Sequence, residues 1–207
     1  MTTTNGRRGE YAKSEQRRRE IIAAAVEVFS ESGFRDGALR DVADRAGITH
    51  AAIRYHFPTK VDLLEAVLRW RDDRALAVGS ASHPDGIGVL RAWLAEIRHN
   101  RETPGLVTLE MTLSAEAATP DHPAYDHFAR HDRIAIKLLQ RAFGQIQEQG
   151  HLVEGCSPDD AAQLVAGATM GLQALWIRNR SIDVADELMR LLQLLVTVDL
   201  GSENKSP

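Results

Sequence analysis

With 207 residues, of which 43% are hydrophobic and 26% charged, the chain is long enough for one large or two small domains and has an ordinary globular composition. It contains no apolar run near the roughly 20 residues that a membrane-spanning helix needs, and its polar N-terminus shows no targeting segment, so no membrane partner is expected. The single cysteine, Cys156, excludes an internal disulfide framework and favours a cytoplasmic location.

The net charge of −4 is unevenly divided along the chain. Residues 1–60 carry 11 Lys and Arg against 8 Asp and Glu, whereas the remaining residues carry 14 against 21. A basic front and an acidic remainder favour a protein whose N-terminal part binds nucleic acid. We expect residues 1–13 to form a disordered basic arm that follows a phosphate backbone, although a merely solvated tail has the same composition.

The first expected helix begins at Ser14, which can cap it, and ends at Gly33. Its apolar side chains recur three and four residues apart, which predicts one buried face. These residues are Ile21, Ile22, Ala25, Val28 and Phe29. We expect this helix to pack under the segment that follows.

Residues 37–60 predict two short helices joined by a tight turn. The first would bury the face formed by Leu39, Val42, Ala43 and Ala46. Gly47 can adopt the left-handed conformation that ends it, and Thr49 can accept a hydrogen bond from the first free amides of the second helix. Because Pro58 restricts the preceding residue to extended geometry, the second helix should end near His56.

Helix, glycine-containing turn and short helix form the helix-turn-helix pattern, whose second helix enters the DNA major groove. The outward side chains of that helix would supply hydroxyls, a ring donor, a methyl group and a guanidinium, which suit the base edges of the groove. They are Thr49, His50, Ala52, Arg54 and Tyr55. A plain corner between two helices would have the same periodicity.

From Ser14 to about Val67 the sequence resembles the DNA-binding domain of the tetracycline-repressor (TetR) family. The matching segments, in order, are residues 21–29, Gly33-Phe34, residues 39–43, residues 46–49, and residues 55–60 followed by Leu63-Leu64. The resemblance implies three N-terminal helices that read DNA, a linking fourth helix, and a variable helical domain for ligand binding and dimerisation. With the outward residues above, the expected DNA contacts are Arg17, Arg40, Thr49, His50, Ala52, Arg54, Tyr55, His56 and Lys60.

The chain also departs from the family's pattern. Gly37 and Ala38 stand where the family usually has Thr and Ser, which weakens the helix cap and removes a hydroxyl often used on phosphate. Ala51 and Arg54 stand where it usually has Gly and a first Tyr. These differences affect the identity of the operator and not the fold.

The rest of the chain is also predicted to be helical. Thr59 and Asp62 can form a capping box for a fourth helix over residues 60–78, and a breaker-rich segment follows at residues 79–86. Five more helices are expected around residues 90–97, after Pro104, over residues 123–149, over residues 157–179, and from Asp183. The fold class is therefore all-α with about nine helices, a DNA-binding domain at 14–60 and a ligand-binding and dimerisation domain at 79–207.

The last two helices predict an interface. Gly167, Gly171 and Ala174 lie four and three residues apart, so they leave one helix face nearly bare for the approach of another backbone. Close packing within one monomer is the alternative. The resemblance implies that two copies pair these helices in a four-helix bundle, and a two-fold pair would read a palindromic operator. The expected dimer contacts are Leu164, Gly167, Gly171, Ala174, Leu188, Leu191 and Leu195.

Large apolar residues of the second domain, with two polar ones, could line a cavity for a small-molecule effector, although such residues also form an ordinary core. They are Trp93, Ile97, Leu109, Glu110, Leu113, Phe128, Phe143, Met170, Gln173 and Trp176. Glu110 is the most informative member, because a carboxylate among apolar neighbours must face solvent, a partner or a polar ligand group.

An enzyme would have to use the polar cluster formed by Asp121, His122, Asp126, His127, His131 and Asp132. His127 and His131 share a helix face, as a metal site needs, but the chain has no H-E-x-x-H sequence, Gly-rich phosphate loop or G-x-S-x-G elbow. We therefore predict no catalytic residues, metal or cofactor. The predicted function is a homodimeric transcriptional repressor that a small molecule releases from its operator; the alternatives are a ligand-binding helical protein without an operator and a metal-dependent enzyme.

Overall fold

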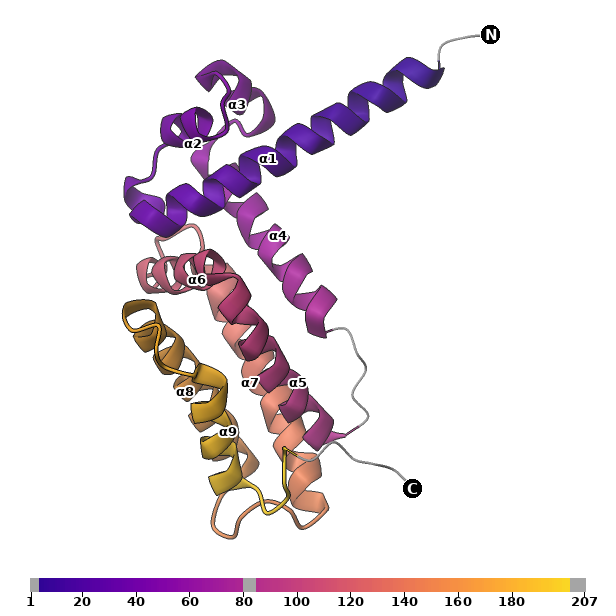
Figure 1. Ribbon diagram of the computed structural model, residues 1–207, viewed down its shortest axis with the longest axis vertical. Helices are drawn as coiled ribbons and strands as arrows, with labels where there is room; N and C mark the ends of the chain where they lie inside the picture. The colour runs from indigo at the N-terminus through magenta and orange to yellow at the C-terminus, as the bar shows by residue number, and fades with distance from the viewer. Residues whose placement is uncertain (1–3, 80–84, 202–207) are drawn as a thin grey trace.

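The computed structural model describes the backbone of residues 4–79 and 85–201 and the side chains of residues 12–72 and 85–201. These residues form nine α-helices and one 3₁₀ turn, with only an isolated β-bridge between Leu152 and Val196. The elements are α1 (Thr4–Asp36), α2 (Leu39–Arg45), α3 (His50–His56), α4 (Lys60–Gly79), α5 (Gly86–His99), η1 (Asn100–Glu102), α6 (Pro104–Glu116), α7 (Tyr125–Glu148), α8 (Pro158–Arg178) and α9 (Val184–Leu195). The all-α prediction is confirmed (Figure 1).

The start of α1 differs from the prediction. The helix already runs from Thr4, so the described part of the expected disordered arm is helical and Ser14 lies inside the helix rather than at its cap. The Arg, Glu, Ala and Lys residues of this segment favour a helix, whereas its Asn5, Gly6 and Gly9 do not, so propensity alone does not explain the extension. Gly33, with a φ of 72°, interrupts the regular helix where the sequence predicts its end.

Side-chain caps begin four of the other eight described helices where the sequence predicts them. Thr49 accepts a hydrogen bond from the Ala52 amide at 3.1 Å, and Thr59 and Asp62 form the reciprocal capping box at the start of α4. Ser157 and Asp183 cap α8 and α9 in the same way. Each cap satisfies amides that the first helical turn leaves free, so these boundaries follow from local sequence.

The apolar core of the N-terminal helices, which we call the head (α1–α3 and the start of α4), continues into the rest of the molecule. Ile53, Phe57 and Leu64 are buried in one cluster with Leu113 and Phe128, which belong to α6 and α7. Figure 1 shows α6 lying against α1 on the side away from α3. The predicted division into domains at 14–60 and 79–207 therefore does not divide this core, which contains residues of both.

A second core holds together the body, formed by α5, α7, α8 and α9. Leu94, Phe143, Val165 and Leu192 are buried in it. The crossing of α5 and α7 is so close that a Cβ atom on Gly86 would lie 2.2 Å from the carbonyl oxygen of Ala142. Among the described residues, no helix combines the length and apolarity needed to cross a lipid bilayer.

Candidate nucleic-acid interface

The short helix α3 is fixed to the head at both ends. Gly47, with a φ of 65°, makes the turn that precedes it, and Thr49 caps its first amides. Ile53 points from its inner side into the core with no exposed surface, and Phe57 at its end is almost fully buried. The outer side chains are therefore presented on a rigid support.

Arg18 provides a further support that the sequence analysis missed. Its Nη1 donates a hydrogen bond to the carbonyl oxygen of His56 at 2.8 Å, and its guanidinium lies 4.4 Å from the centre of the Phe57 ring. Burial, and then the positive charge of Arg18, lower the pKa of His56. No local pattern singles out Arg18, because its partners lie almost 40 residues away along the chain.

The predicted reading residues lie on the outer surface of α3. Thr49, His50, Arg54 and Tyr55 are exposed, Tyr55 by 84%, whereas Ala52 and His56 are half-buried. Arg40 on α2 is also exposed. Arg17 on α1 is exposed and paired with Glu20 at 2.7 Å. A helix with exposed polar side chains and a buried inner face has the arrangement that direct reading of a groove requires.

Lys60 lies differently from the prediction that its ammonium faces a phosphate at the start of α4. Its Nζ donates a hydrogen bond to the carbonyl oxygen of Arg35 at 3.0 Å and lies 4.5 Å from the centre of the Phe34 ring. Burial lowers its pKa, while Glu116 and Asp36 act in the opposite direction. A carbonyl and an aromatic face thus hold this ammonium, which argues for a structural role in the head.

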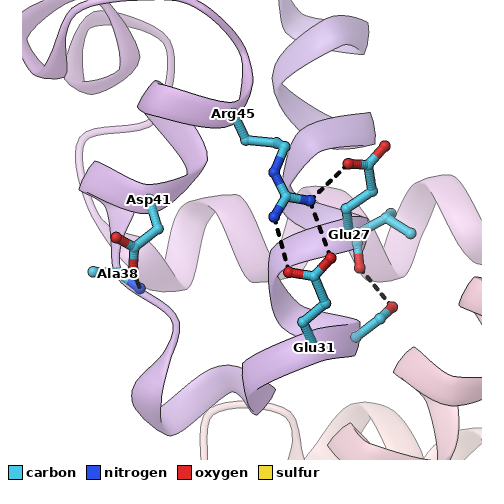
Figure 2. Close-up of polar contacts among 7 residues, drawn as sticks. Glu27, Glu31, Ala38, Asp41 and Arg45 are labelled. Atoms are coloured by element: carbon cyan, nitrogen blue, oxygen red, sulfur yellow. Dashed lines mark hydrogen bonds and ion pairs between the residues drawn. The ribbon is translucent and has the colours of Figure 1, made fainter.

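A surface ion-pair group joins α2 to α1 (Figure 2). The guanidinium of Arg45 contacts the carboxylates of Glu27 and Glu31, each at 2.8 Å, and hydrogen bonding to Arg45 lowers the pKa of Glu31. At the other end of α2, Asp41 accepts a hydrogen bond from the Ala38 amide at 3.1 Å (Figure 2). One of the two hydrogen bonds of a capping box is therefore present, whereas the other is missing because Ala38 has no hydroxyl.

The head meets the rest of the molecule at Phe34. Its amide donates a hydrogen bond to Oε2 of Glu116 on α6 at 2.7 Å, and the edge of its ring contacts His122, with centroids 5.4 Å apart. A Cβ atom on Gly33 would lie 2.2 Å from Oε1 of the same carboxylate. Because Gly33 has a left-handed backbone conformation and no side chain, the Glu116 carboxylate can approach closely enough to bind the Phe34 amide.

A second polar contact joins the middle of α4 to α6. Arg71, 90% buried at its side chain, pairs with Glu110 on α6 and lies 3.3 Å from Asp72 and 3.5 Å from Nε2 of His131. Glu110 therefore finds a protein partner, one of the three possibilities that the sequence leaves open. Burial, and then the charge of Glu110, raise the pKa of the neighbouring Glu96.

The predicted effector residues do not surround one cavity. Leu109, Leu113 and Phe128 belong to the core shared with the head, whereas Phe143 is fully buried in the body core. Met170 is 40% exposed on the outside of α8. The indole of Trp93 donates a hydrogen bond to Thr169 at 3.1 Å. Of the predicted set, Ile97, Gln173 and Trp176 line a common cleft.

The polar cluster proposed for an enzyme is dispersed. His122 is buried against Phe34, His127 faces Asp72 at 3.8 Å, and His131 faces Glu110 at 4.0 Å. Within the described residues, no three His, Cys, Asp or Glu side chains come together in a way that could hold a metal ion. Each histidine instead contacts another element of the fold.

The predicted dimer residues are divided between the surface and the core. Leu164 is 53% exposed on α8, and Cβ atoms on Gly167 and Gly171 would meet open space, so this face has no partner within the protomer. Leu188 and Leu195 are instead buried in the body core, which corrects their assignment to the interface. Leu192 is buried on the same side of α9 as Leu188 and Leu195, so this side of the helix packs inward. Leu194 lies on the outward side and is 74% exposed.

Comparison with known proteins finds a family match in the N-terminal part of the chain. Residues 21–67 match the family described as bacterial regulatory proteins, tetR family. The HTH-type transcriptional regulator SrpR of Pseudomonas putida is 35% identical over 92 residues, covering 42% of this chain but only 38% of SrpR. The HTH-type transcriptional repressor BepR of Brucella suis is 24% identical over 173 residues, covering 80% of this chain and 83% of BepR.

Solved structures extend the similarity to the body. The complex of SmeT, a repressor from Stenotrophomonas maltophilia, with triclosan has a TM-score of 0.71 at 19% identity and covers 93% of this chain and 97% of that chain. At this level of identity the likeness shows that the two proteins share a fold.

Proposed function

This chain belongs to the tetR family of bacterial regulatory proteins, and we propose that it is a homodimeric transcriptional repressor that a small molecule releases from a palindromic operator. The observation that carries the proposal is α3. This helix is capped at Thr49, anchored by Ile53 and held at its end by Arg18, while its polar side chains face solvent.

The side chains of α3 divide into two roles on DNA. Arg54 is exposed and can donate paired hydrogen bonds to O6 and N7 of guanine, a contact worth about 1–3 kcal/mol against a wrong base. Thr49, His50 and Tyr55 supply further groups for base edges or phosphates. Arg17 and Arg40, on neighbouring helices, suit the phosphate backbone, which fixes position without reading sequence.

Two copies are needed because one short helix reads only a few base pairs. The exposed face of α8, which contains Leu164, Gly167, Gly171 and Leu175, offers an apolar surface with little side-chain relief, and Leu194 on α9 extends it. Pairing this face about a two-fold axis would carry two α3 helices to half-sites about one helical turn apart.

Regulation would act through α4, which leads from the head to the body. SmeT, which shares the fold, forms a complex with triclosan, and a body site for a small molecule is the corresponding proposal here. The pair between Arg71 and Glu110 fixes α4 to α6, so a ligand that favours a different arrangement of α6 would move the head. Such a ligand shifts the equilibrium by its differential affinity for the two arrangements.

The two alternatives have less support. A metal-dependent enzyme would need a ligand set that the described residues do not bring together. A ligand-binding protein without an operator would not explain why the polar side chains of α3 are so rigidly presented.

Substitution of Arg54 tests the proposal. On the operator that the protein selects from random DNA, Arg54→Ala should lose preference at one base pair in each half-site, with binding to the other single-base variants nearly unchanged. Fluorescence-anisotropy titrations at several salt concentrations measure this. Arg40→Ala is the matched control, because loss of a phosphate contact should weaken all sequences equally and reduce the salt dependence. Equal losses on every sequence for Arg54→Ala would contradict base reading by α3.

A further inference from the structure

Ionisable side chains gather where α4, α6 and α7 meet. The buried Arg71 guanidinium pairs with Glu110 on α6 and lies 3.3 Å from Oδ1 of Asp72 on its own helix. On α7, Nε2 of His127 lies 3.8 Å from the same oxygen of Asp72. One turn farther along α7, Nε2 of His131 lies 4.0 Å from Oε1 of Glu110, the oxygen that Arg71 contacts. Arg71 and two imidazole rings therefore compete for two carboxylates, and we call these five residues the Arg71 cluster.

The contacts of the two rings fit their neutral forms. Nε2 of His131 lies 3.5 Å from Nη2 of Arg71, which can only donate, so the neutral ring accepts there and carries its proton on Nδ1. Among the described residues, Nε2 of His127 is buried without a hydrogen-bond partner. Burial lowers the pKa of His127 first of all, and the Asp72 carboxylate acts in the opposite direction. With both rings neutral, Arg71 holds both carboxylates.

The groups around the cluster leave it with an excess of negative charge. On α5, Glu96 faces Arg71 and Glu110. On α7, the exposed Arg130 lies close enough to His127 to act on its charge. While the rings are neutral, the three carboxylates of this region therefore face only two guanidinium groups. Negative surroundings favour the charged form of a histidine, so the rings can take up protons as the pH falls.

We propose that the Arg71 cluster is a proton-operated switch, in which protonation of His127 and His131 transfers the two carboxylates from Arg71 to α7. A proton on Nε2 of His131 ends its hydrogen bond with Arg71 and places two cations 3.5 Å apart. The same proton attracts Glu110, and a proton on Nε2 of His127 attracts Asp72. The link between α4 and α6 is thereby exchanged for separate links of each helix to α7.

The effect of this exchange on DNA rests on the proposed function. Because α4 leads to the head, weakening its link to α6 lets the head populate positions that do not match two half-sites. Operator affinity falls in proportion to the fraction of protein that keeps the binding arrangement. A fall in pH should therefore release the operator, as the small-molecule effector does.

A double-mutant cycle measured without DNA tests the switch itself. Urea denaturation of the wild type, Arg71→Met, Glu110→Gln and the double variant gives the coupling between the two side chains. We expect this coupling, as a ratio of unfolding constants, to fall at least about threefold between about pH 7.5 and about pH 5.5. In a background with His127→Gln and His131→Gln, the coupling should not change with pH. Equal pH dependence in both backgrounds would overturn the proposal.

Crystal structures of the wild type at the two pH values give a check that needs no variant, in case Arg71→Met does not fold. At the lower pH, Glu110 should contact His131 and Asp72 should contact His127. An unchanged pair between Arg71 and Glu110 at the lower pH would overturn the proposal.

Operator titrations at the same two pH values test the regulatory role. Between them the wild type should lose at least about fivefold more affinity than the variant with both histidines changed to Gln. Histidines that face DNA, such as His50, affect both proteins alike. His151→Gln, between α7 and α8, is the matched control and should behave as the wild type. If the buried His127 does not tolerate substitution, His131→Gln alone should reduce the loss, because that ring is 37% exposed.

The two kinds of measurement separate this inference from the proposed function. A coupling that falls with pH, together with the expected loss of operator affinity, supports both. The same coupling with equal operator titrations in both proteins contradicts a regulatory role of the switch. Absence of any operator binding would contradict the proposed function and leave the cycle without DNA to decide whether the carboxylates change partners.

Discussion

At the scale of single residues, His122 shows how a buried ring is held in one protonation state. Its Nδ1 accepts a hydrogen bond from the Ala124 amide at 3.2 Å, so the neutral ring carries its proton on Nε2. That nitrogen is buried without a hydrogen-bond partner, 4.0 Å from Glu116. A second proton on Nδ1 would face the Ala124 amide donor. Burial lowers the pKa of His122 first of all, which also favours the neutral ring.

The lowered pKa gives the stability of the protein a defined dependence on pH. When the pH is lowered past the unfolded pKa of about 6.5, the histidine binds a proton more readily in the unfolded chain than in the folded one. The free energy of unfolding should therefore decrease as the pH is lowered, until the pH passes below the folded pKa. His56 and His127, whose pKa values are also lowered mainly by burial, should add to this loss. His122→Asn, whose Oδ1 can replace Nδ1 as acceptor, should reduce the slope.

Urea denaturation between pH 5 and 8 measures this slope. The exposed His50 provides the control, because His50→Asn should leave it unchanged. An identical pH dependence in wild type and His122→Asn would show that His122 does not contribute.

At the scale of elements, α8 and α9 have different partners. The inward side of α9 completes the body core, while the outward side of α8 keeps its glycines and leucines uncovered. Helix-interior glycine costs about 1 kcal/mol relative to alanine, so two of them on one uncovered face indicate a packing demand outside the protomer. The exposed Leu194 lies on the neighbouring helix α9.

Gly171→Leu should therefore prevent close pairing of two α8 helices while the protomer stays folded, because its Cβ would meet open space within the protomer. Sedimentation velocity should show a monomer, with far-UV circular dichroism unchanged. Gly105→Leu places the same side chain in open space on α6 and should leave the oligomeric state as in wild type. A folded dimer of the Gly171 variant would place the interface elsewhere.

The elements also show what the sequence could predict. Caps such as Thr49, and Thr59 with Asp62, act within three residues, so a local pattern identified them. The contacts of Arg18 and of Lys60 join residues 38 and 25 positions apart, and their partner atoms are backbone carbonyls that no pattern marks. The spacing of Leu188, Leu191 and Leu195 places them on one side of α9, but periodicity does not say whether that side faces its own core or a second copy.

At the scale of the whole molecule, α6 is shared between head and body. Its Glu110 pairs with Arg71 of α4, and its Glu116 accepts a hydrogen bond from the Phe34 amide at the end of α1. Because both carboxylates belong to one helix, a displacement of α6 would change both contacts. The position of the head is thus determined by a continuous apolar core and by polar contacts to α6, which also include the hydrogen bond from the Ser30 hydroxyl to the Gly105 carbonyl at 2.8 Å.

Glu110→Gln should disturb the head as well as any response to ligand. The loss of its charge leaves Arg71 paired only with Asp72, which should reduce stability by about 1–3 kcal/mol, less than for a fully buried pair because a fifth of the Glu110 side chain is exposed. We also expect an altered operator affinity without ligand, since α4 carries the head.

Urea denaturation and anisotropy titrations measure these two effects. Glu65→Gln is the control, because it removes one partner of the exposed Arg69–Glu65 pair on α4. It should change neither the stability nor the operator affinity. Wild-type operator affinity in a stably folded Glu110→Gln variant would show that the pair does not couple α4 to α6.

The central claim is that two copies of α3 read DNA as a symmetric pair. Selection of protein-bound fragments from a random DNA library by the full-length protein tests it most directly. The expected result is one enriched sequence made of two inverted half-sites, with centres about one helical turn or a whole multiple of it apart. Failure to enrich any sequence, or enrichment of a single site without inverted symmetry, would contradict the claim.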